Sequence, residues 1–252
     1  MTPTRIFWLA AKIVAALWMA AAGYAIFFIA PDERTMHEIQ RIFYMHVASA
    51  WTAGIAFLVV AVAGLLYLVK RDPRYDWAAI SAAESGLAFT TVVLVTGPIW
   101  AKPIWGIWWT WDPRLTWTFV LWLMYIAYLL IGTLVEDRNR HGVLRAVYGL
   151  FAFINVPIVW FSIRWWRGQH PSPVVAGAEP GSRLDPTMWA VLFFTWGATL
   201  ALFAVLMRGR YRLEAIRGAT EELRQQAEDS APAHSDAPGL SGADTPVRAS
   251  LI

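Results

Sequence analysis

Six long apolar segments constrain this chain more than any other feature of its sequence. They lie at about residues 6–30, 44–69, 78–100, 115–135, 144–163 and 186–207. Each can cross the hydrocarbon core of a bilayer, which is about 30 Å thick and takes roughly 20 helical residues. A backbone that faces lipid must satisfy its own hydrogen bonds, so each span is expected to be a helix. The sequence therefore predicts an all-α integral membrane protein, a bundle of six transmembrane helices.

The composition agrees with this prediction. Hydrophobic residues make up 58% of the chain and charged residues 15%, against roughly 45–50% and about 25% in a soluble domain. The chain has no cysteine, which excludes disulfides, thiolate metal sites and iron–sulfur clusters. Most basic residues lie in short loops between apolar segments, so the net charge of +3 does not indicate nucleic-acid binding.

The distribution of Lys and Arg between the loops sets the expected orientation. Eleven lie at the end of the spans that carries the N-terminus, and seven lie at the opposite end in longer loops. Because short cytoplasmic loops of membrane proteins carry the excess of Lys and Arg, both termini are expected in the cytoplasm. The loops near 31–43, 101–114 and 164–185 are then expected to face outward.

Beyond the last span the chain becomes polar. Of its 39 charged residues (21 basic and 18 acidic), 13 follow residue 207. Residues 1–207 are expected to form the membrane domain. Residues 208–228 predict a basic, then mixed-charge helix at the cytoplasmic surface. Residues 229–252, rich in Ala, Ser, Pro, Asp and Gly, predict a disordered tail.

Tryptophan is concentrated in one outer loop. Six of the 16 tryptophans fall within residues 100–117: Trp100, Trp105, Trp108, Trp109, Trp111 and Trp117. An aromatic belt at the membrane surface would need only a couple of rings at each helix end. Here the rings lie beside Lys102, Asp112 and Arg114, and such a surface can stack on a flat aromatic ligand whose polar edge meets the charges. A porphyrin fits this description, and a quinone or a lipid headgroup remains an alternative.

Three of the five histidines are expected on the same outer side as this loop. His46 lies in the first turn of the second span, His170 follows the fifth span, and His37 lies in a polar stretch and is the weaker candidate. His141 and His234 are expected to be solvated on the cytoplasmic side. One histidine at an interface is more often a polar anchor than a ligand. Two histidines flanking an aromatic loop favour axial ligation of haem iron, and iron with both axial positions filled suits holding haem more than activating oxygen.

Two prolines and one acid lie within the spans. Pro98 in the third span and Pro157 in the fifth each lack the N–H that a helix needs at that position, and each predicts a bend. Glu84 is an acid inside the third span, where a charge is costly. A local hydrogen bond from Ser81 or Ser85 is expected to satisfy it.

Several well-known motifs are absent from the sequence, and their absence limits the functions that it predicts. The chain has no GxxxxGK[ST] and no CxxCH, so neither nucleotide hydrolysis nor covalently attached haem is predicted. No nucleophile motif is present either, so an enzyme is not predicted. A redox cytochrome b that moves electrons across the bilayer would need histidine pairs at both depths, and only one pair is available.

The chain from about residue 40 to 207 resembles a known family. The string WGIWWTWDPRLT, from Trp105, resembles the WWD signature of haem-handling membrane proteins. The strings RIFYMHVASAW around His46, LVTGPIWAKPIWG before the loop, and NVPIVWFS followed by RWWRGQH around His170 resemble one family in particular, cytochrome c maturation protein C, or haem exporter protein C. The larger haem-attaching ligases and synthases share the WWD string but have longer chains and more spans.

The resemblance implies that the protein holds haem b non-covalently between His46 and His170, at the periplasmic face of the plasma (inner) membrane. The residues implied to contact the haem or its recipient are Trp105, Trp108, Trp109, Trp111, Asp112 and Arg114. Arg114 is a candidate partner for the propionates, and Lys102, Arg41 and Arg167 compete for that role.

The resemblance also implies partners for c-type cytochrome biogenesis. The recipient would be a periplasmic haem chaperone, cytochrome c maturation protein E, and ATP-binding cassette subunits A and B with the small protein D would work alongside. Three alternatives stay open. These are a haem-attaching ligase of the same superfamily, a membrane redox cytochrome b, and a permease or scaffold subunit with an aromatic belt and no cofactor.

Overall fold

The computed structural model describes residues 2–134, 138–166, 168, 170 and 184–230. Within these residues the regular elements are helices, apart from one isolated bridge between Glu33 and His37. The elements are α1 (Pro3–Tyr24), the π-helix η1 (Ala25–Ile29), the 3-10 helix η2 (Glu38–Gln40), α2 (Arg41–Lys70), α3 (Pro73–Trp105), α4 (Pro113–Leu134), α5 (Arg138–Phe153), α6 (Asn155–Trp165) and α7 (Pro186–Ser230).

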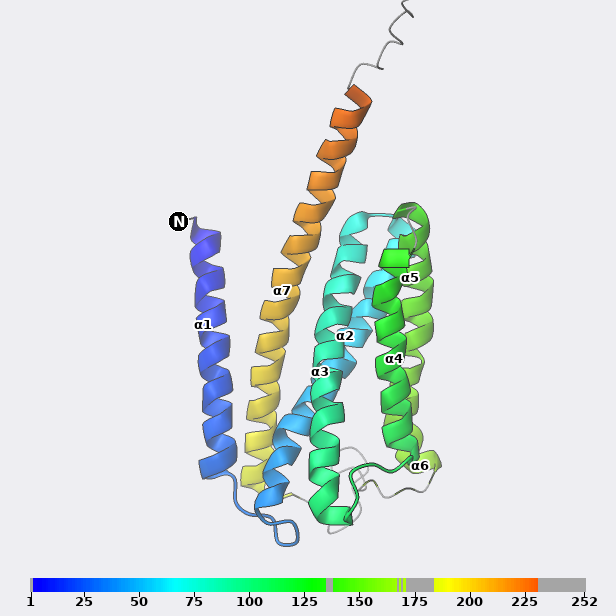
Figure 1. The fold of residues 1–252 in the computed structure, drawn as a ribbon. Helices are drawn as coiled ribbons and strands as arrows, with labels where there is room; N and C mark the ends of the chain where they lie inside the picture. The colour runs from blue at the N-terminus through cyan, green and yellow to red at the C-terminus, as the bar shows by residue number, and fades with distance from the viewer. Residues whose placement is uncertain (1, 135–137, 167, 169, 171–183, 231–252) are drawn as a thin grey trace, which may run out of the picture. The chain divides into compact units, whose positions relative to one another are not determined.

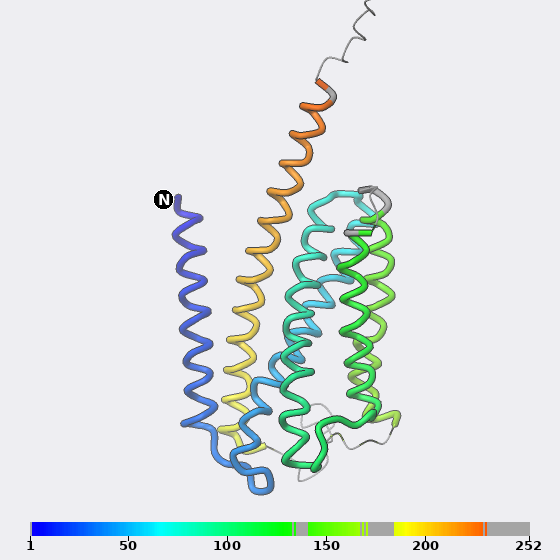
Figure 2. Tube along the Cα trace, viewed as in Figure 1, coloured from blue at the N-terminus to red at the C-terminus, as the bar shows by residue number. Residues whose placement is uncertain are grey.

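Six helical spans in the described residues are long and apolar enough to cross a membrane. They are Pro3–Ile29, Glu38–Lys70, Pro73–Trp105, Pro113–Gly132, His141–Trp165 and Pro186–Glu228. The prediction of an all-α membrane protein with six transmembrane helices is therefore confirmed. Successive spans run in opposite directions, so the last residues of α1, α3 and α6 lie at one end of the bundle and those of α2 and α4 at the other (Figures 1 and 2).

The chain divides into two units, Met1–Ala215 and Ile216–Ile252. The first unit holds the candidate site described below. α7 is one uninterrupted helix that includes residues 208–228. Most of the predicted tail, residues 231–252, lies outside the described residues.

The core of the first unit is built around α2, which packs against α3 and α5. The ring of Phe57 on α2 stacks on that of Tyr125 on α4, with 3.7 Å between centroids. A Cβ on Gly86 of α3 would lie 2.6 Å from the Phe57 ring, so a glycine is needed for α3 to approach α2 this closely. Thr52 of α2 and Thr199 of α7 are hydrogen bonded at 2.8 Å, which ties the last span to this core.

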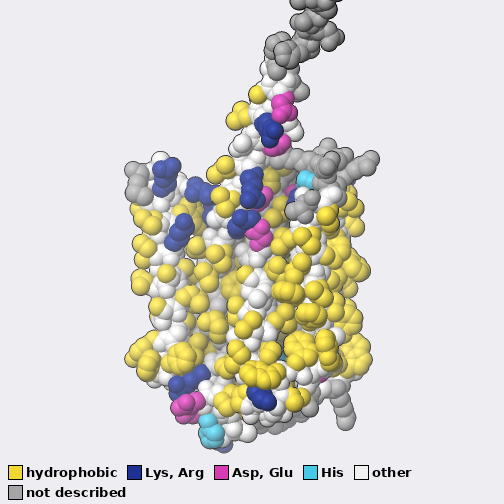
Figure 3. All heavy atoms as spheres, viewed as in Figure 1, with side chains coloured by type: hydrophobic (Ala, Val, Ile, Leu, Met, Phe, Trp, Pro, Cys, Tyr) yellow, Lys and Arg dark blue, Asp and Glu magenta, His cyan; other side chains and the backbone are white. Residues whose placement is uncertain are grey.

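The outer surface of the spans is apolar. Figure 3 shows a broad band of hydrophobic side chains over the helices, with Lys and Arg gathered at the end where the N-terminus lies. Large apolar side chains such as Phe28, Val69 and Leu134 are more than 70% exposed. Contiguous apolar surface of this kind suits lipid contact and would be a liability in water.

Glu84 does not make the local hydrogen bond expected from the sequence. The hydroxyl of Ser81 donates to the carbonyl of Trp77 and that of Ser85 to the carbonyl of Ser81. Glu84 instead accepts from the guanidinium of Arg210 on α7. The prediction was wrong because an opposite charge on a neighbouring helix neutralises an intramembrane carboxylate better than a hydroxyl can.

The two span prolines behave differently. α3 continues as a helix through Pro98. The fifth span is interrupted at Ile154, between α5 and α6, where Pro157 has no N–H for the carbonyl of Phe153. The side-chain amide of Asn155, just after the interruption, donates to the carbonyl of Trp117 at 3.2 Å and so links α6 to α4.

Candidate functional site

A cavity of about 1410 Å³ lies at the end of the bundle opposite the N-terminus. Its walls come from α2, α3, α4, α6 and α7 and from the segment that joins the first two spans. Pockets for small molecules usually measure about 300–1,000 Å³, so this cavity can take a large ligand. Its end of the bundle is the one for which the basic residues predict an outward orientation.

His46 and His170 both line this cavity. His46 comes from the second turn of α2, and the half-buried His170 follows α6. His37 is exposed and is not part of the lining. Its backbone has a positive φ of 49° in the tight turn before η2. His234 lies outside the described residues. The two histidines singled out as candidate ligands therefore share one space.

One turn of α3 holds the imidazole of His46. Nδ1 of His46 lies 2.9 Å from the hydroxyl oxygen of Thr96. The indole of Trp100 meets the imidazole edge to face, with centroids 5.8 Å apart. A Cβ on Gly97 would lie 3.4 Å from Cε1 of His46, so the glycine leaves room for the ring. These three contacts fix the ring's orientation beside the cavity.

The segment that carries His170 lies close to the start of α4. A Cβ on Gly168 would lie 3.2 Å from Cβ of Asp112, so the backbone of this segment contacts the tryptophan loop (residues 106–112). α6 ends where the N–H of Trp166 bonds to the carbonyl of Ser162 at 2.9 Å. Gly168, two positions before His170 in the sequence, therefore lies beside the tryptophan loop.

The tryptophan loop begins where α3 ends at Gly106. This residue has φ +76°, a conformation that favours glycine, and its N–H bonds to the carbonyl of Lys102 at 3.0 Å. The ammonium of Lys102 donates to the carbonyl of Gly106 at 2.8 Å. Trp105 and Trp109 line the cavity. Trp108 and Trp111 are not part of that lining and are 57% and 73% exposed.

Asp112 caps α4. Its Oδ1 accepts the N–H of Leu115 at 3.1 Å, and its Oδ2 accepts the hydroxyl of Thr110 at 3.0 Å. Pro113 follows at the first helical position, where proline is favoured. The side chain of Asp112 is only 9% exposed and does not line the cavity. Its carboxylate therefore orders the end of the loop and meets the positive end of the helix dipole.

Arg114 is the one candidate propionate partner that lines the cavity in the described part of the chain. Its Nη2 donates to the carbonyl of Trp160 at 3.1 Å, which ties α4 to α6 and fixes the guanidinium at the wall. Arg41 instead pairs with Asp32 at 3.2 Å. Lys102 is turned toward the backbone of Gly106, and Arg167 lies outside the described residues.

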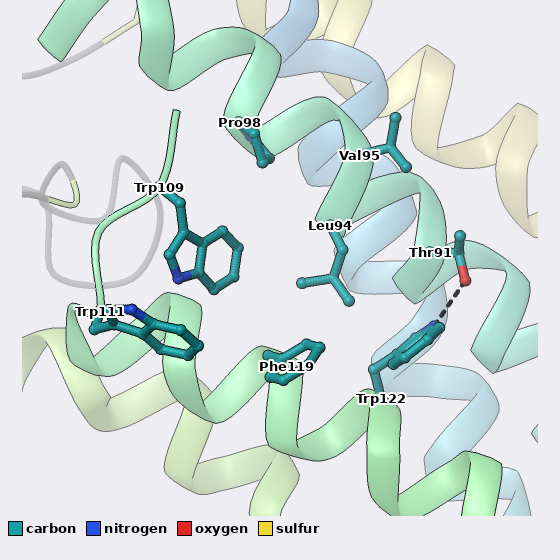
Figure 4. A pocket seen from close by; sticks show the side chains of 8 residues that line it. All are labelled: Thr91, Leu94, Val95, Pro98, Trp109, Trp111, Phe119 and Trp122. Atoms are coloured by element: carbon teal, nitrogen blue, oxygen red, sulfur yellow. Dashed lines mark hydrogen bonds between the residues drawn. The ribbon is translucent and has the colours of Figure 1, made fainter. Parts of the chain in front are cut away.

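A smaller apolar pocket of about 460 Å³ lies beside the cavity, between α3 and α4. Figure 4 shows Trp109 and Trp111 of the loop facing Phe119 of α4, with Leu94 and Pro98 of α3 opposite. Trp109, Leu94 and Pro98 line both spaces. Trp109 is therefore part of the wall between them.

The donors and walls of the cavity fit haem. Imidazole nitrogen is a common axial ligand of haem iron, and the cavity offers two imidazoles. A bare metal ion would need three or more protein ligands, and the described residues contain no group of three His, Cys, Asp or Glu with that geometry. Trp100, Trp105 and Trp109 give the walls aromatic surface for a macrocycle, and Arg114 supplies a positive charge for a carboxylate.

Comparison with known proteins gives a consistent family. The model of the family described as "Heme exporter protein C" matches residues 2–226. The Heme exporter protein C of Bradyrhizobium diazoefficiens is 35% identical over 88% of this chain and 86% of its own length. That of Escherichia coli (strain K12) is 33% identical over 77% of this chain and 80% of its own. A "putative cytochrome c biosynthesis ccmC-like mitochondrial protein" of Marchantia polymorpha is 32% identical over 74% and 78%.

Proposed function

Because the chain belongs to the heme exporter protein C family, we propose that its cavity binds haem through His46 and His170 and releases it to a recipient outside the membrane. The family handles haem for cytochrome c biogenesis, and the six spans make this chain a multi-pass membrane protein. One observation carries the proposal. Two histidines from distant parts of the chain line the same aromatic cavity.

In this proposal haem b is cargo, held without a covalent bond. The two imidazoles fill both axial positions of the iron, which leaves no open position for oxygen or for a substrate. Trp105 and Trp109 cover the macrocycle, and Arg114 meets a propionate. The protein is then a delivery subunit and not an enzyme, because the site holds its cargo and makes no new bond in it.

The exposed part of the tryptophan loop suits the transfer step. Trp108 and Trp111 present aromatic surface next to the cavity without lining it. We propose that a periplasmic haem chaperone, cytochrome c maturation protein E, docks on these rings and takes the haem. ATP-binding cassette subunits A and B and the small protein D would then act on the loaded complex.

This transfer requires the cavity to open on the periplasmic side of the plasma membrane. The basic residues support that orientation. Lys70, Arg71 and Arg74 lie at the α2–α3 connection, and Arg208 contacts Trp8 near the start of α1. All belong to the end of the bundle opposite the cavity, and the positive-inside rule assigns that end to the cytoplasm.

The visible spectrum of the purified, detergent-solubilised protein tests the haem site. We expect a low-spin spectrum with two histidine ligands. The variants His46→Ala and His170→Ala should lose that spectrum or most of their haem, and added imidazole should restore part of it by filling the emptied position. His37→Ala is the control, since His37 is exposed outside the cavity. An unchanged spectrum in His170→Ala would remove that residue from the site.

A further inference from the structure

The hydroxyl oxygen of Thr96 lies 2.9 Å from Nδ1 of His46, one of the two nitrogens of its imidazole. We infer that Thr96 is a positioning residue, which fixes the tautomer of His46 and so turns the unprotonated Nε2 toward the iron. The inference rests on the proposed function, because it concerns how one of the two proposed ligands is prepared. It assigns a role to a residue that does not itself line the cavity.

The contacts of Thr96 determine which nitrogen of His46 carries the imidazole proton. The hydroxyl oxygen of Thr96 lies 2.7 Å from the carbonyl oxygen of Val92 and 3.4 Å from that of Val93. Both carbonyls can only accept, so the single hydroxyl proton of Thr96 is directed to the helix backbone. The same oxygen lies 2.9 Å from Nδ1 of His46 and is left to accept there. Nδ1 therefore carries the proton of the imidazole.

A proton on Nδ1 leaves Nε2 of His46 free to bind a metal. A neutral imidazole has one N–H, and the other nitrogen has a free lone pair. With the proton on Nδ1, the lone pair is on Nε2, the nitrogen on the far side of the ring from Thr96. Only a nitrogen with a free lone pair can bind iron, so the Thr96 hydroxyl selects the tautomer that can bind iron through Nε2.

The contacts from α3 also hold the Thr96 hydroxyl and the His46 imidazole in place. The bond from Thr96 to the carbonyl four residues earlier fixes the rotamer of its hydroxyl. Trp100 and Gly97 bound the same imidazole from the same turn of α3. A histidine ligand whose second nitrogen donates to a fixed acceptor is held in one orientation and is a stronger base toward the metal. Thr96 therefore affects both the geometry and the strength of the proposed iron–nitrogen bond.

Substitutions at Thr96 can remove or keep its hydroxyl group while the side-chain volume changes little. Thr96→Val removes the acceptor with little change in volume, and Thr96→Ser keeps a hydroxyl in place. Thr91→Val is the matched control. On the same helix, the hydroxyl of Thr91 donates to the carbonyl of Leu87 at 2.8 Å and accepts Nε1–H of Trp122 at 2.9 Å. Thr91 makes the same two kinds of hydrogen bond as Thr96. Its partner Trp122 is not a proposed ligand, however, and Thr91 does not line the large cavity.

We expect Thr96→Val to lower haem affinity on the order of 10- to 100-fold. The midpoint potential of the haem that remains should shift to a more positive value, because a less basic imidazole stabilises ferric iron less. Thr96→Ser should restore affinity and potential, and Thr91→Val should match the unmodified protein. Wild-type affinity and potential in Thr96→Val would overturn the inference.

A second measurement keeps the inference testable if Thr96→Val does not fold. Nitrogen NMR of the haem-free protein labelled with ¹⁵N-histidine distinguishes the two tautomers, and the signal missing in His46→Ala identifies His46. A proton on Nε2 of His46 would overturn the inference. A different result would contradict the proposed function itself: His46→Ala would then retain the haem spectrum of the unmodified protein.

Discussion

Glu84 of α3 and Arg210 of α7 form an ion pair although 126 residues separate them in the sequence. Both side chains are about 30% exposed, and Arg210 also reaches Glu214 at 3.5 Å. The pair joins the last span to the third at the end of the bundle opposite the cavity. Removing Arg210 takes away the positive charge that neutralises Glu84, whereas removing Glu84 leaves Arg210 with only the longer contact to Glu214 among these two carboxylates.

Glu84→Ala should therefore lower the free energy of unfolding by about 1–3 kcal/mol, less than for a fully buried pair because solvent reaches both groups. The measurement is denaturant unfolding in detergent micelles. The double variant Glu84→Ala/Arg210→Ala should lose less than the sum of the two single variants. Additive losses would show that the two side chains do not stabilise each other.

Substitutions of Asp112 distinguish its structural role as the cap of α4 from a direct role in haem transfer. As the cap of α4 it accepts a backbone N–H, which an asparagine can also do. Asp112→Ala should cost about 0.5–2 kcal/mol at the start of α4 and impair transfer of haem to the chaperone. Asp112→Asn should restore transfer, measured by co-purification of the two proteins from cells that make haem. An asparagine variant as defective as the alanine variant would assign the carboxylate's charge a direct role in transfer.

Much of the fold was predictable because bilayer thickness fixes the length of a span. Each of the six apolar segments corresponds to an observed helix, and Pro157 marks the interruption of the fifth span. The partner of Glu84 was not predictable, because nothing local in the sequence shows which residue of α7 faces α3. Topology alone indicated that His46 and His170 lie at the same end of the bundle.

Within the site, the sequence carried one signal that was missed. An aspartate followed by proline before an apolar helix is typical of a helix N-terminus, and Asp112-Pro113 has that form. Two other features carried no signal. A loop has no periodicity, so the sequence did not show that Trp109 lines the cavity while Trp108 and Trp111 are exposed. The contact of Thr96 with His46 depends on how α3 packs on α2.

Trp105 at the end of α3 and Trp109 of the loop line the cavity, whereas Trp108 and Trp111 of the loop are exposed, and the two pairs predict different defects. Trp105→Ala and Trp109→Ala should weaken haem binding, since stacking contributes about 0.5–1.5 kcal/mol per ring pair. Haem occupancy after purification measures this effect. Trp108→Ala and Trp111→Ala should retain most of their haem and form less of the haem–chaperone complex. If all four variants load the chaperone at the normal rate, the loop is an interfacial belt only.

Gly97 tests how much room the imidazole of His46 needs. A methyl group at this position would lie 3.4 Å from Cε1 of His46, at the close limit of van der Waals contact, and would restrict how the ring can adjust to a ligand. Gly97→Ala should leave the helix stable and lower haem affinity by up to about 10-fold, since ligand geometry tolerates little displacement. Gly23→Ala is the control, because a Cβ there meets no atom within 4 Å. Equal haem affinity in the two variants would mean that the ring adapts freely.

The orientation of the bundle is the condition on which delivery to a periplasmic partner depends. α3 ends at the cavity end of the bundle, and α2 and α4 end at the other. A reporter that is active only outside the cytoplasm should therefore be active when fused after residue 110 or 175 and silent when fused after residue 72 or 140. The four fusions control one another, because a reporter that fails to fold would be silent at every position. The reverse pattern would open the cavity to the cytoplasm, and the two histidines could then hold haem without a route to a chaperone on the far side of the membrane.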